Sequence, residues 1–476
     1  MDSTGVVVPR GEGDRRSSTA LGRAVTADAL SAVDPVGAEA ALRENDWRSG
    51  YAGHLRRLVQ AGLGSGDDAA RIATDGLASL WSRMRVVTAT GAEAPLAEAV
   101  GQPVHHALAT RTITGTAAPA PFTLPFGGRR LAGEALLEQV ALWEERGALE
   151  PSAAEAVREV AAHPEWLALP GRRVVVLGAA SEMGPLQALL EWGAEVIAVD
   201  LPRRDLWRRL ENLARGSAGV LHLPDGAGET GADLLHDLPA IRQWLAGFEG
   251  PLVLGNYAYA DGATNLRLSL ATDALACALT DARDDVTLSY LATPTDVFGV
   301  PEEVVTTSIE AYEHSRLRAM RPLAKALSAG RLLQRNYRPG PEPGIADAVI
   351  PQQGPNYLLA KRAQRWRATV ARKASVPVSL LVAPPTRTRS VTKNRALAAA
   401  YGGAHHFGVD VFAPATSNVL MAALLVHDLV TGSAVSDEPW RAEAVKAVHG
   451  GLWRGPYAPR SALGIALLLG WGVSRG

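Results

Sequence analysis

The pattern of hydrophobic and polar residues changes near Gly171. Before it, residues 25–168 carry apolar side chains at three- and four-residue spacing, which predicts helices joined by loops. After it, short runs rich in Val and Leu alternate with helical stretches, which is typical of βαβ units in a parallel sheet buried on both faces. The predicted fold class is therefore α/β, a doubly wound parallel sheet of Rossmann type with a mainly helical N-terminal extension. The predicted strands are residues 173–178, 194–200, 218–224, 251–256, 286–292 and 376–384.

The chain of 476 residues is long for one domain, and the pattern divides it into four parts. The longest apolar run, residues 462–473, is shorter than the ~20 residues that span a bilayer. A buried terminal helix is expected there, with an interfacial anchor as the alternative. The four parts are a polar, disordered tail at 1–24, a mainly helical accessory region at 25–168, the Rossmann domain at 169–435 with an insertion at 299–353, and a C-terminal helical segment at 436–476.

A glycine loop follows the first predicted strand. Gly178 and Gly184 bound the segment GAASEMG, a helical stretch follows, and Asp200 closes the second strand. Such a loop offers backbone N–H groups to a pyrophosphate, and a carboxylate after the second strand hydrogen-bonds the ribose hydroxyls of a dinucleotide. Asp200 repels a 2′-phosphate and so favours NAD, whereas Arg203 and Arg204 could accept the 2′-phosphate of NADP.

This loop resembles the G-x-x-x-G-x-G turn of the short-chain dehydrogenase/reductase family, with Glu182 in place of the middle glycine. The order of the later segments, up to about residue 435, is similar to that family. The resemblance implies an acidic residue near the adenine after the third strand, and GNYA resembles the family's segment after the fourth strand. The cofactor-binding residues that it implies are Gly178, Ser181, Glu182, Met183, Gly184, Asp200, Asp225, Asn256, Lys361 and Thr388.

The same resemblance implies a set of catalytic residues. Tyr357 and Lys361 match the family's Y-x-x-x-K motif, and Asn265 matches its structural active-site asparagine. The candidates for the position of the catalytic serine are Thr293 and, as alternatives, Thr295 and Ser289.

Tyr357 and Lys361 lie four residues apart on a predicted helix and so share a face. A nearby ammonium favours the phenolate and is expected to lower the pKa of Tyr357. The tyrosine would then accept a proton from an alcohol, or return it to a carbonyl, while hydride moves to or from a nicotinamide. The hydroxyl of Thr293 would bind the substrate oxygen and stabilise its developing charge.

One spacing departs from the family. Thr293 and Tyr357 are 64 residues apart, much further than in typical members, and residues 299–353 account for the difference. This insertion contains a helical piece and a proline-rich loop. Beside an active site it would shape or cover the substrate pocket, or else mediate assembly.

Composition and charge exclude several classes of function. The net charge of −1 gives no overall basic field for nucleic acid or an acidic membrane. The single cysteine, Cys277, excludes an intrachain disulfide and a cysteine-based zinc site, and no metal-ligand spacing occurs, so no metal is expected. We expect a cytoplasmic protein that acts on a small molecule and binds neither nucleic acid nor membrane. The family resemblance implies a homo-oligomer.

The leading hypothesis is an NAD(P)-dependent oxidoreductase that interconverts a secondary alcohol and a carbonyl on a small organic molecule. NAD is the expected cofactor and NADP the alternative. A second hypothesis is an epimerase or dehydratase that holds NAD tightly and oxidises its substrate transiently. A third is a non-catalytic Rossmann scaffold that senses a nucleotide or assembles a complex, because Glu182 replaces a glycine of the loop.

Overall fold

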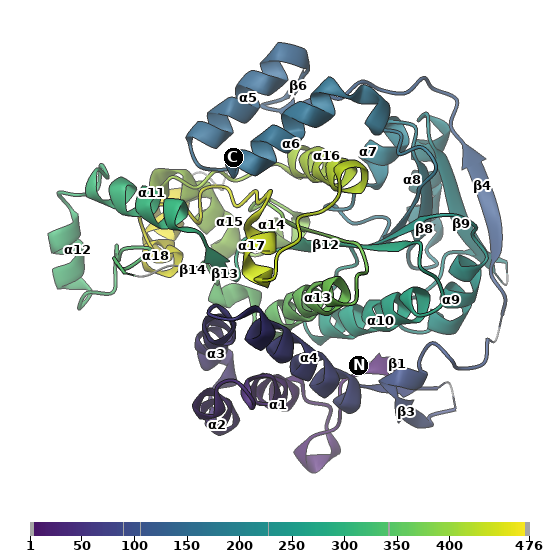
Figure 1. Ribbon diagram of the computed structural model, residues 1–476, viewed down its shortest axis with the longest axis horizontal. Coiled ribbons are helices and arrows are strands. Elements are labelled where there is room, and N and C mark those ends of the chain that lie inside the picture. Colours follow the sequence, from purple (N-terminus) through teal and green to yellow (C-terminus); the bar gives the residue numbers. More distant parts are fainter. Residues whose placement is uncertain (1–3, 89, 105, 227, 341–342, 472–476) are drawn as a thin grey trace.

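The computed structural model describes residues 4–471 except 89, 105, 227, 341 and 342. In this part of the chain, six parallel strands form the centre of an eight-stranded sheet, with helices on both sides (Figure 1). The spatial order is β9-β8-β7-β11-β12-β15, so the chain winds outward in both directions from β7. This is the strand order of a doubly wound, Rossmann-type sheet, as the sequence predicts. The strands are β7 (Arg173–Leu177), β8 (Glu195–Val199), β9 (Val220–Gly226), β11 (Leu252–Asn256), β12 (Val286–Ala292) and β15 (Val378–Val382).

Helices cover both faces of this sheet, because alternate side chains of each strand point to opposite faces. On β7, Val174 and Val176 join one hydrophobic core, and Val175 and Leu177 join the other. The first core includes α7 (Leu186–Glu191), α8 (Arg204–Arg215) and α16 (Pro414–Thr431). The second includes α9 (Leu238–Ala246), α10 (Ala263–Thr280) and α13 (Pro355–Lys373).

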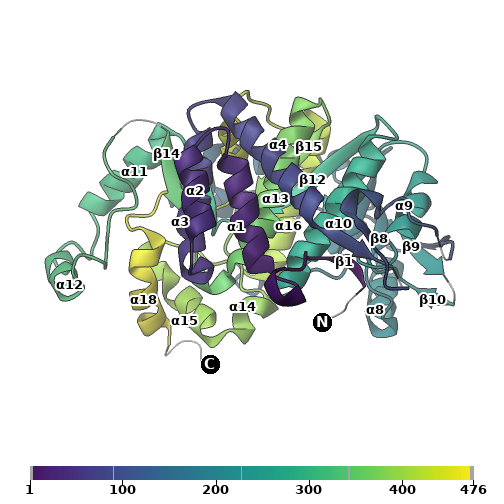
Figure 2. The same ribbon diagram turned by 90° about the horizontal axis from the view of Figure 1, so that it is seen from below.

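The N-terminal region adds an outer layer on each side (Figures 1 and 2). On one side the Trp81 indole donates to Asp273 of α10 (2.6 Å), and Arg367 of α13 pairs with the same carboxylate (2.6 Å). The layer on this side consists of α1 (Ser18–Leu30), α2 (Pro35–Arg43), α3 (Trp47–Gly62) and α4 (Gly66–Arg83). The layer that packs on α16 consists of α5 (Gly133–Glu145) and α6 (Pro151–Ala162).

The prediction of a disordered tail at 1–24 is wrong for the described residues 4–24. Val6, Val7 and Val8 are buried, and the Val6 amide donates to the Leu235 carbonyl (3.2 Å). These valines enter the core because β1 pairs with a hairpin that the sequence pattern missed, and α1 begins at Ser18. The strands of this small sheet are β1 (Gly5–Val7), β2 (Arg85–Val87) and β3 (Glu93–Pro95).

The accessory region also contains strands that helical periodicity did not predict. The strand β4 (Ala109–Thr114) pairs antiparallel with β9 and extends the central sheet. A salt bridge from Arg111 to Asp225 (2.9 Å) and the short antiparallel strand β10 (Glu229–Thr230) strengthen this edge. A separate hairpin is formed by β5 (Leu124–Phe126) and β6 (Arg129–Leu131).

The insertion at 299–353 begins and ends in a two-stranded ladder, β13 (Val297–Val300) with β14 (Gly344–Asp347). From this base, α11 (Glu302–Glu313) and α12 (Arg321–Leu327) project away from the sheet (Figure 1). A small apolar cluster, which includes Tyr312, Phe407 and Ala466, joins them to the 3-10 helix Ala404–Phe407 and to α18 (Pro459–Gly470), and α18 packs on α15 (Arg395–Gly403). The other short helices are α14 (Arg389–Lys393), α17 (Pro439–Ala444) and the 3-10 helices Glu12–Asp14, Leu96–Glu98, Pro164–Trp166, Pro351–Gln353 and Ala404–Phe407.

One expectation for the C-terminal part needs correction. The segment 436–471 is only partly helical, since residues 445–458 run as irregular chain between α17 and α18. No helix within residues 4–471, apart from the omitted positions, is long and apolar enough to cross a membrane.

A buried ion pair fixes this C-terminal chain and makes stability depend on pH. Burial alone would raise the pKa of Glu150, but hydrogen bonds and charge from His449 and Arg454 hold it at about 2, below the ordinary 4.5. A carboxyl with a depressed native pKa stabilises the fold above its unfolded pKa and loses that contribution as the pH falls. We therefore expect the free energy of unfolding to fall by about 3 kcal/mol between pH 5 and pH 2 on account of Glu150, measured by urea titration.

The variant Glu150→Gln tests this assignment. It should lower stability at neutral pH and flatten the acid dependence, because no carboxylate remains beside Arg454 (2.8 Å in the native chain). Glu155→Gln is the control, since Glu155 is 62% exposed and, among the residues that the structure describes, bridges only to Arg158. An acid profile of Glu150→Gln that superimposes on the native one would refute the assignment.

Candidate active site

The carboxyl ends of the parallel strands meet at one edge of the sheet. At the junction of β7 and β11 the strand order reverses, which is where ligands bind in doubly wound sheets. The chain crosses here at close range: the Tyr257 amide donates to the Leu177 carbonyl (2.9 Å), and a Cβ on Gly178 would lie 2.6 Å from the Ala258 Cα. Gly178 also has a φ of +82°, so this position requires glycine.

The glycine loop satisfies most of its own N–H groups. The amides of Gly178 and Ala179 both donate to the Val199 carbonyl of β8 (2.9 and 3.1 Å). The helix α7 after the loop has only six residues, and Pro185 stands at its N-cap. The backbone N–H groups that the sequence predicts for a pyrophosphate therefore mostly donate to acceptors within the protein in this structure. The remaining internal bonds are Ser181 to Gly178 O (3.0 Å), Gly184 to Ser181 O (3.1 Å) and Met183 to Ser181 Oγ (3.4 Å).

Asp200 connects the glycine loop to β8. Its Oδ2 accepts the Ala180 amide and its Oδ1 accepts the Leu201 amide, both at 2.8 Å. Burial raises the pKa of this carboxyl against the lowering effect of those two hydrogen bonds. Each Asp200 oxygen thus accepts one backbone hydrogen bond and keeps a second acceptor position for a ribose hydroxyl.

Glu182 turns away from the loop and reaches the segment after β15. Its Oε1 lies 3.2 Å from Nε of Arg389, and its Oε2 accepts the Arg389 amide (2.8 Å). The neighbouring Thr388, predicted to face a nicotinamide, bonds instead to Ser390 (2.9 Å). The Glu182–Arg389 pair therefore bridges two segments that would have to receive a dinucleotide between them.

Thr293, Tyr357 and Lys361 come together beside the end of β12. Tyr357 lies in the first turn of α13, and its buried phenol lies close enough to Thr293 for that hydroxyl to lower the pKa of the phenol. The Thr293 hydroxyl lies 2.8 Å from that of Thr295, which accepts a hydrogen bond from Gln353 (2.6 Å). The fold thus brings the Thr293 hydroxyl and the Tyr357 phenol near each other, although 64 residues separate them along the chain.

The expected effect of the lysine on the tyrosine is not what the structure shows. Burial raises the pKa of Tyr357, and the hydrogen bond with Thr293 offsets only part of that rise. Lys361 donates to the Leu291 carbonyl (2.8 Å) and to Gln364 (3.3 Å), and burial lowers its pKa to about 8. At neutral pH Tyr357 is therefore a protonated phenol, suited to donating a proton rather than accepting one.

The other predicted residues serve local structure. Asn265 accepts the Ala260 amide (3.2 Å), and Asn256 donates to Thr272 (2.6 Å) while its Oδ1 has no partner among the described residues. Ser289 bonds to Tyr257 (3.1 Å) and so is not the hydroxyl beside Tyr357. Asp225 bonds Arg111 and Thr230, at the sheet edge that β4 covers.

Sequence reasoning missed a buried ionic network under this site. Asp296, three residues after Thr293, is 1% exposed and pairs with Arg362 (2.8 Å) and Arg365 (2.7 Å) of α13. Arg365 pairs in turn with Glu443. The only signal in the sequence was the row of arginines on α13, which reads equally well as a solvated helix face.

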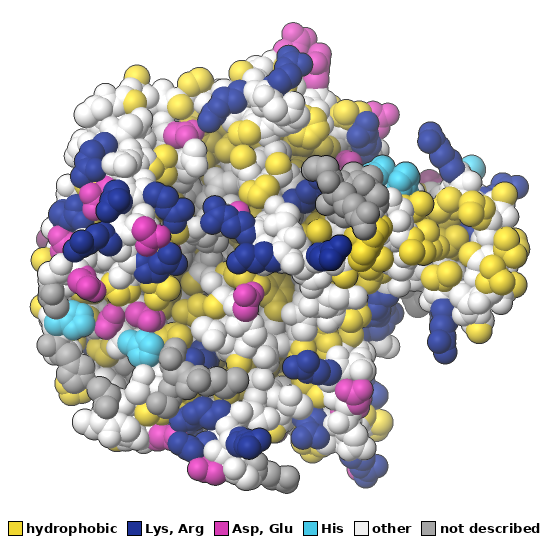
Figure 3. All heavy atoms as spheres, turned by 180° about the vertical axis from the view of Figure 1, so that it is seen from behind, with side chains coloured by type: hydrophobic (Ala, Val, Ile, Leu, Met, Phe, Trp, Pro, Cys, Tyr) yellow, Lys and Arg dark blue, Asp and Glu magenta, His cyan; other side chains and the backbone are white. Residues whose placement is uncertain are grey.

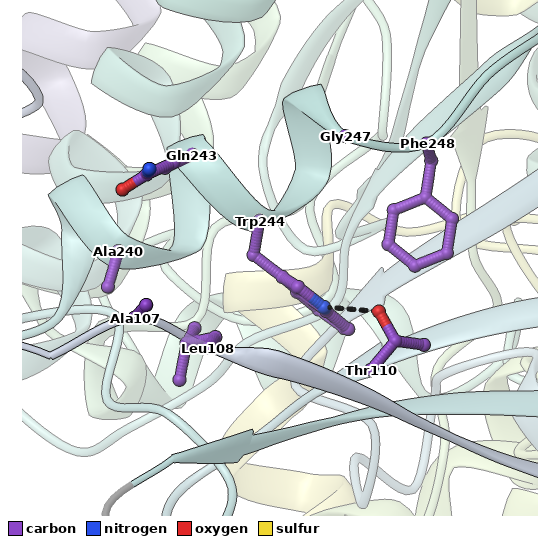
Figure 4. Close-up of a pocket in the computed structure, with 8 residues that line it drawn as sticks. All are labelled: Ala107, Leu108, Thr110, Ala240, Gln243, Trp244, Gly247 and Phe248. Carbon is purple, nitrogen blue, oxygen red and sulfur yellow. Dashed lines mark hydrogen bonds between the residues drawn. The ribbon is translucent and has the colours of Figure 1, made fainter.

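A pocket of about 300 Å³ lies elsewhere, between α9 and β4 (Figure 4). Its wall includes Trp244, whose indole donates to Thr110 (2.9 Å), and Phe248. Because β4 lies beyond β9 and Tyr357 lies beside β12, the width of the sheet separates this pocket from the candidate site.

The sheet order and the groups at its carboxyl edge define a Rossmann-type α/β protein with a hydroxyl–phenol–ammonium site. No protein-family model matches the chain, and no curated protein matches it. Among solved structures, a short-chain dehydrogenase/reductase family oxidoreductase from Burkholderia thailandensis is 15% identical, covering 59% of this chain and 92% of that one, with a TM-score of 0.32.

Two further solved structures are similar to part of the chain. An A1-type ketoreductase is 16% identical over 59% of this chain and 48% of its own, with a TM-score of 0.31. A thiolation-reductase di-domain from an archaeal non-ribosomal peptide synthetase is 11% identical over 54% and 52%, with a TM-score of 0.29. This chain matches only about half the length of those two proteins. These likenesses are too distant to support an inference about function.

Proposed function

We propose that the protein is an NAD(P)-dependent oxidoreductase that reduces a carbonyl on a small organic molecule. The observation that carries the proposal is the proximity of Thr293 and the buried Tyr357, four residues before Lys361, at the carboxyl edge of a Rossmann-type sheet. Reduction is the proposed direction, because the raised pKa of Tyr357 keeps the phenol protonated and able to donate.

The two hydroxyls suit a carbonyl oxygen. Thr293 and Tyr357 can both donate hydrogen bonds to that oxygen, and the phenol can release its proton as negative charge develops there. A bound dinucleotide would supply the hydride. Lys361, mostly protonated at neutral pH, places positive charge beside the same turn of α13.

The residues near the expected nicotinamide suit a dinucleotide, whereas the glycine loop near the expected pyrophosphate does not favour its binding. The reacting end has its hydroxyl, phenol and ammonium, whereas the glycine loop is bonded internally and tied to Arg389 through Glu182. That tie is weak, because Arg389 is 74% exposed and an exposed ion pair contributes roughly 0–1 kcal/mol. Micromolar binding of a dinucleotide corresponds to about 8 kcal/mol and could separate the pair.

Glu182→Gly should therefore raise dinucleotide affinity by about tenfold or more. The change removes a carboxylate that would repel the pyrophosphate and releases Arg389 to bind it. The measurement is calorimetric titration of native and variant protein with NADH and NADPH, after absorbance has been checked for retained cofactor. The preferred dinucleotide would decide between the effects of Asp200 and those of Arg203 and Arg204.

Arg389→Ala is the matched control, since it breaks the same ion pair but leaves the carboxylate in place. It should give no gain in affinity. If native protein, Glu182→Gly and Arg389→Ala all fail to bind either dinucleotide, the oxidoreductase proposal falls.

A non-catalytic scaffold is the second candidate, and the internally bonded glycine loop favours it. It predicts no dinucleotide binding and no effect of Tyr357→Phe beyond local stability. The epimerase or dehydratase alternative would instead retain NAD through purification and show no net consumption of added NADH.

A further inference from the structure

The part of the insertion that projects furthest from the sheet, around α12, presents an apolar helix face to solvent. Met320, Leu323 and Leu327, on α12 and at its start, are 61%, 63% and 79% exposed, at the three- and four-residue spacing of one helix side. Leu468 and Leu469 at the end of α18 are also exposed. Ala324 of α12 and Ile465 of α18 belong to one apolar cluster, so the two helices are parts of one lobe. We call the segment 315–340 together with α14, α15 and α18 the basic lobe.

The charge of this lobe differs from that of the rest of the chain. Residues 315–340 contain seven Lys and Arg and no Asp or Glu, although the whole chain has a net charge of −1. The helices beside it add little free charge, because Arg389 pairs with Glu182 and Arg460 pairs with Asp347. Within residues 315–340 the positive charge thus coincides with the exposed apolar side chains of α12, and the acidic residues lie elsewhere in the chain.

Some arginines of residues 315–340 pack against other side chains, and others are exposed to solvent. Arg321 and Arg335 stack on the Tyr312 ring (4.0 and 4.9 Å), and Arg335 also pairs with Glu313. These contacts fix the base of the lobe. A second group is exposed and makes no ion pair with any described acidic residue: Arg316, Arg318, Arg331 and Arg338.

From behind, hydrophobic side chains gather over the projecting lobe and dark-blue cationic side chains stand around them (Figure 3). We infer that the basic lobe docks on an anionic membrane surface. Exposed leucines with surrounding arginines match the requirements of an interfacial helix, which inserts its apolar side between headgroups and keeps its cations beside lipid phosphates. The occupant is a lipid surface and not a second copy of the chain, because a two-fold contact would place each cationic rim against its equal.

The test is flotation of the full chain with phosphatidylcholine vesicles, with and without phosphatidylserine. Binding is expected to the phosphatidylserine vesicles and to weaken as salt is raised. The double variant Leu323→Glu, Leu327→Glu should reduce the vesicle partition coefficient at least about tenfold. Arg316→Glu with Arg318→Glu should reduce it at least about tenfold as well.

The matched control is Val36→Glu with Leu42→Glu on α2, where both side chains are exposed (69% and 58%) but lie outside the lobe. This control should bind vesicles as the native chain does, and circular dichroism should show that every variant is folded. Failure of the native chain to bind phosphatidylserine vesicles would overturn the inference. So would light scattering that shows self-association abolished by the lobe variants while vesicle binding stays unchanged.

Discussion

Replacing Tyr357 with phenylalanine is expected to lower turnover by about a hundred- to ten-thousand-fold, the usual contribution of a positioned proton donor. The variant keeps the ring, which packs edge-on against Tyr259 (6.1 Å between centroids), and loses only the hydroxyl near Thr293. The measurement is the initial rate of NADH or NADPH oxidation with a panel of small ketones and aldehydes. Thermal unfolding should change little, which separates loss of chemistry from loss of fold.

Tyr259→Phe is the control for this prediction. The Tyr259 hydroxyl bonds to Asp261 (2.9 Å) and its side chain is 49% exposed, so removal should leave turnover near the native value. Thr293→Val should resemble Tyr357→Phe, because it removes the other donor to the carbonyl oxygen. Native rates in Tyr357→Phe would leave the phenol without a role in the reaction and favour the scaffold.

The sheet could be predicted because parallel strands that are buried on both faces have sequences rich in consecutive Val and Leu residues. All six of the predicted strands form, and their order agrees with a doubly wound sheet. The edges could not be predicted in this way. The strand β4, with sequence ATRTIT, is largely polar and pairs only on one side, so its conformation comes from β9 rather than from its own hydrophobic pattern.

The candidate site was only partly predictable, because sequence spacing gives proximity and not partners. The four-residue spacing of Tyr357 and Lys361 placed them on one helix, but the direction of the tyrosine pKa depends on burial and on where Lys361 donates. The glycine loop is a similar case. Its glycines predicted a cradle, whereas Asp200 and the Val199 carbonyl take up its donors.

Whole-chain net charge was also a poor guide to partners. A net charge near zero is the sum over the whole chain. Here the cationic segment of 26 residues, 315–340, is offset by acidic residues elsewhere. The long-range field at a surface depends on local charge within about 8 Å at physiological salt. The exclusion of a membrane on net charge therefore does not apply to the basic lobe.

The largest expected loss of stability is for Arg365→Met. Arg365 is 3% exposed and its guanidinium contacts Asp296 (2.7 Å), the Val297 carbonyl (2.8 Å) and Glu443 (2.9 Å). Methionine fills much of the volume over Phe298 but leaves Glu443 buried without its cation. Removing one partner of a buried ion pair costs about 3–5 kcal/mol, against a total stability of roughly 5–15 kcal/mol. Urea unfolding measures the difference.

Arg441→Met supplies the comparison, since Arg441 is 54% exposed and pairs only with Glu438, so its loss should cost under about 1 kcal/mol. Adding Glu443→Leu to Arg365→Met should recover part of the stability, because the orphaned carboxylate is then gone. Equal losses in Arg365→Met and Arg441→Met would show that the network contributes nothing. Because Asp296 ties the segment after Thr293 to the helix that carries Tyr357, a weakened network should also reduce turnover in protein that remains folded. The pairing of hydroxyl and phenol would then depend on charges that neither residue touches.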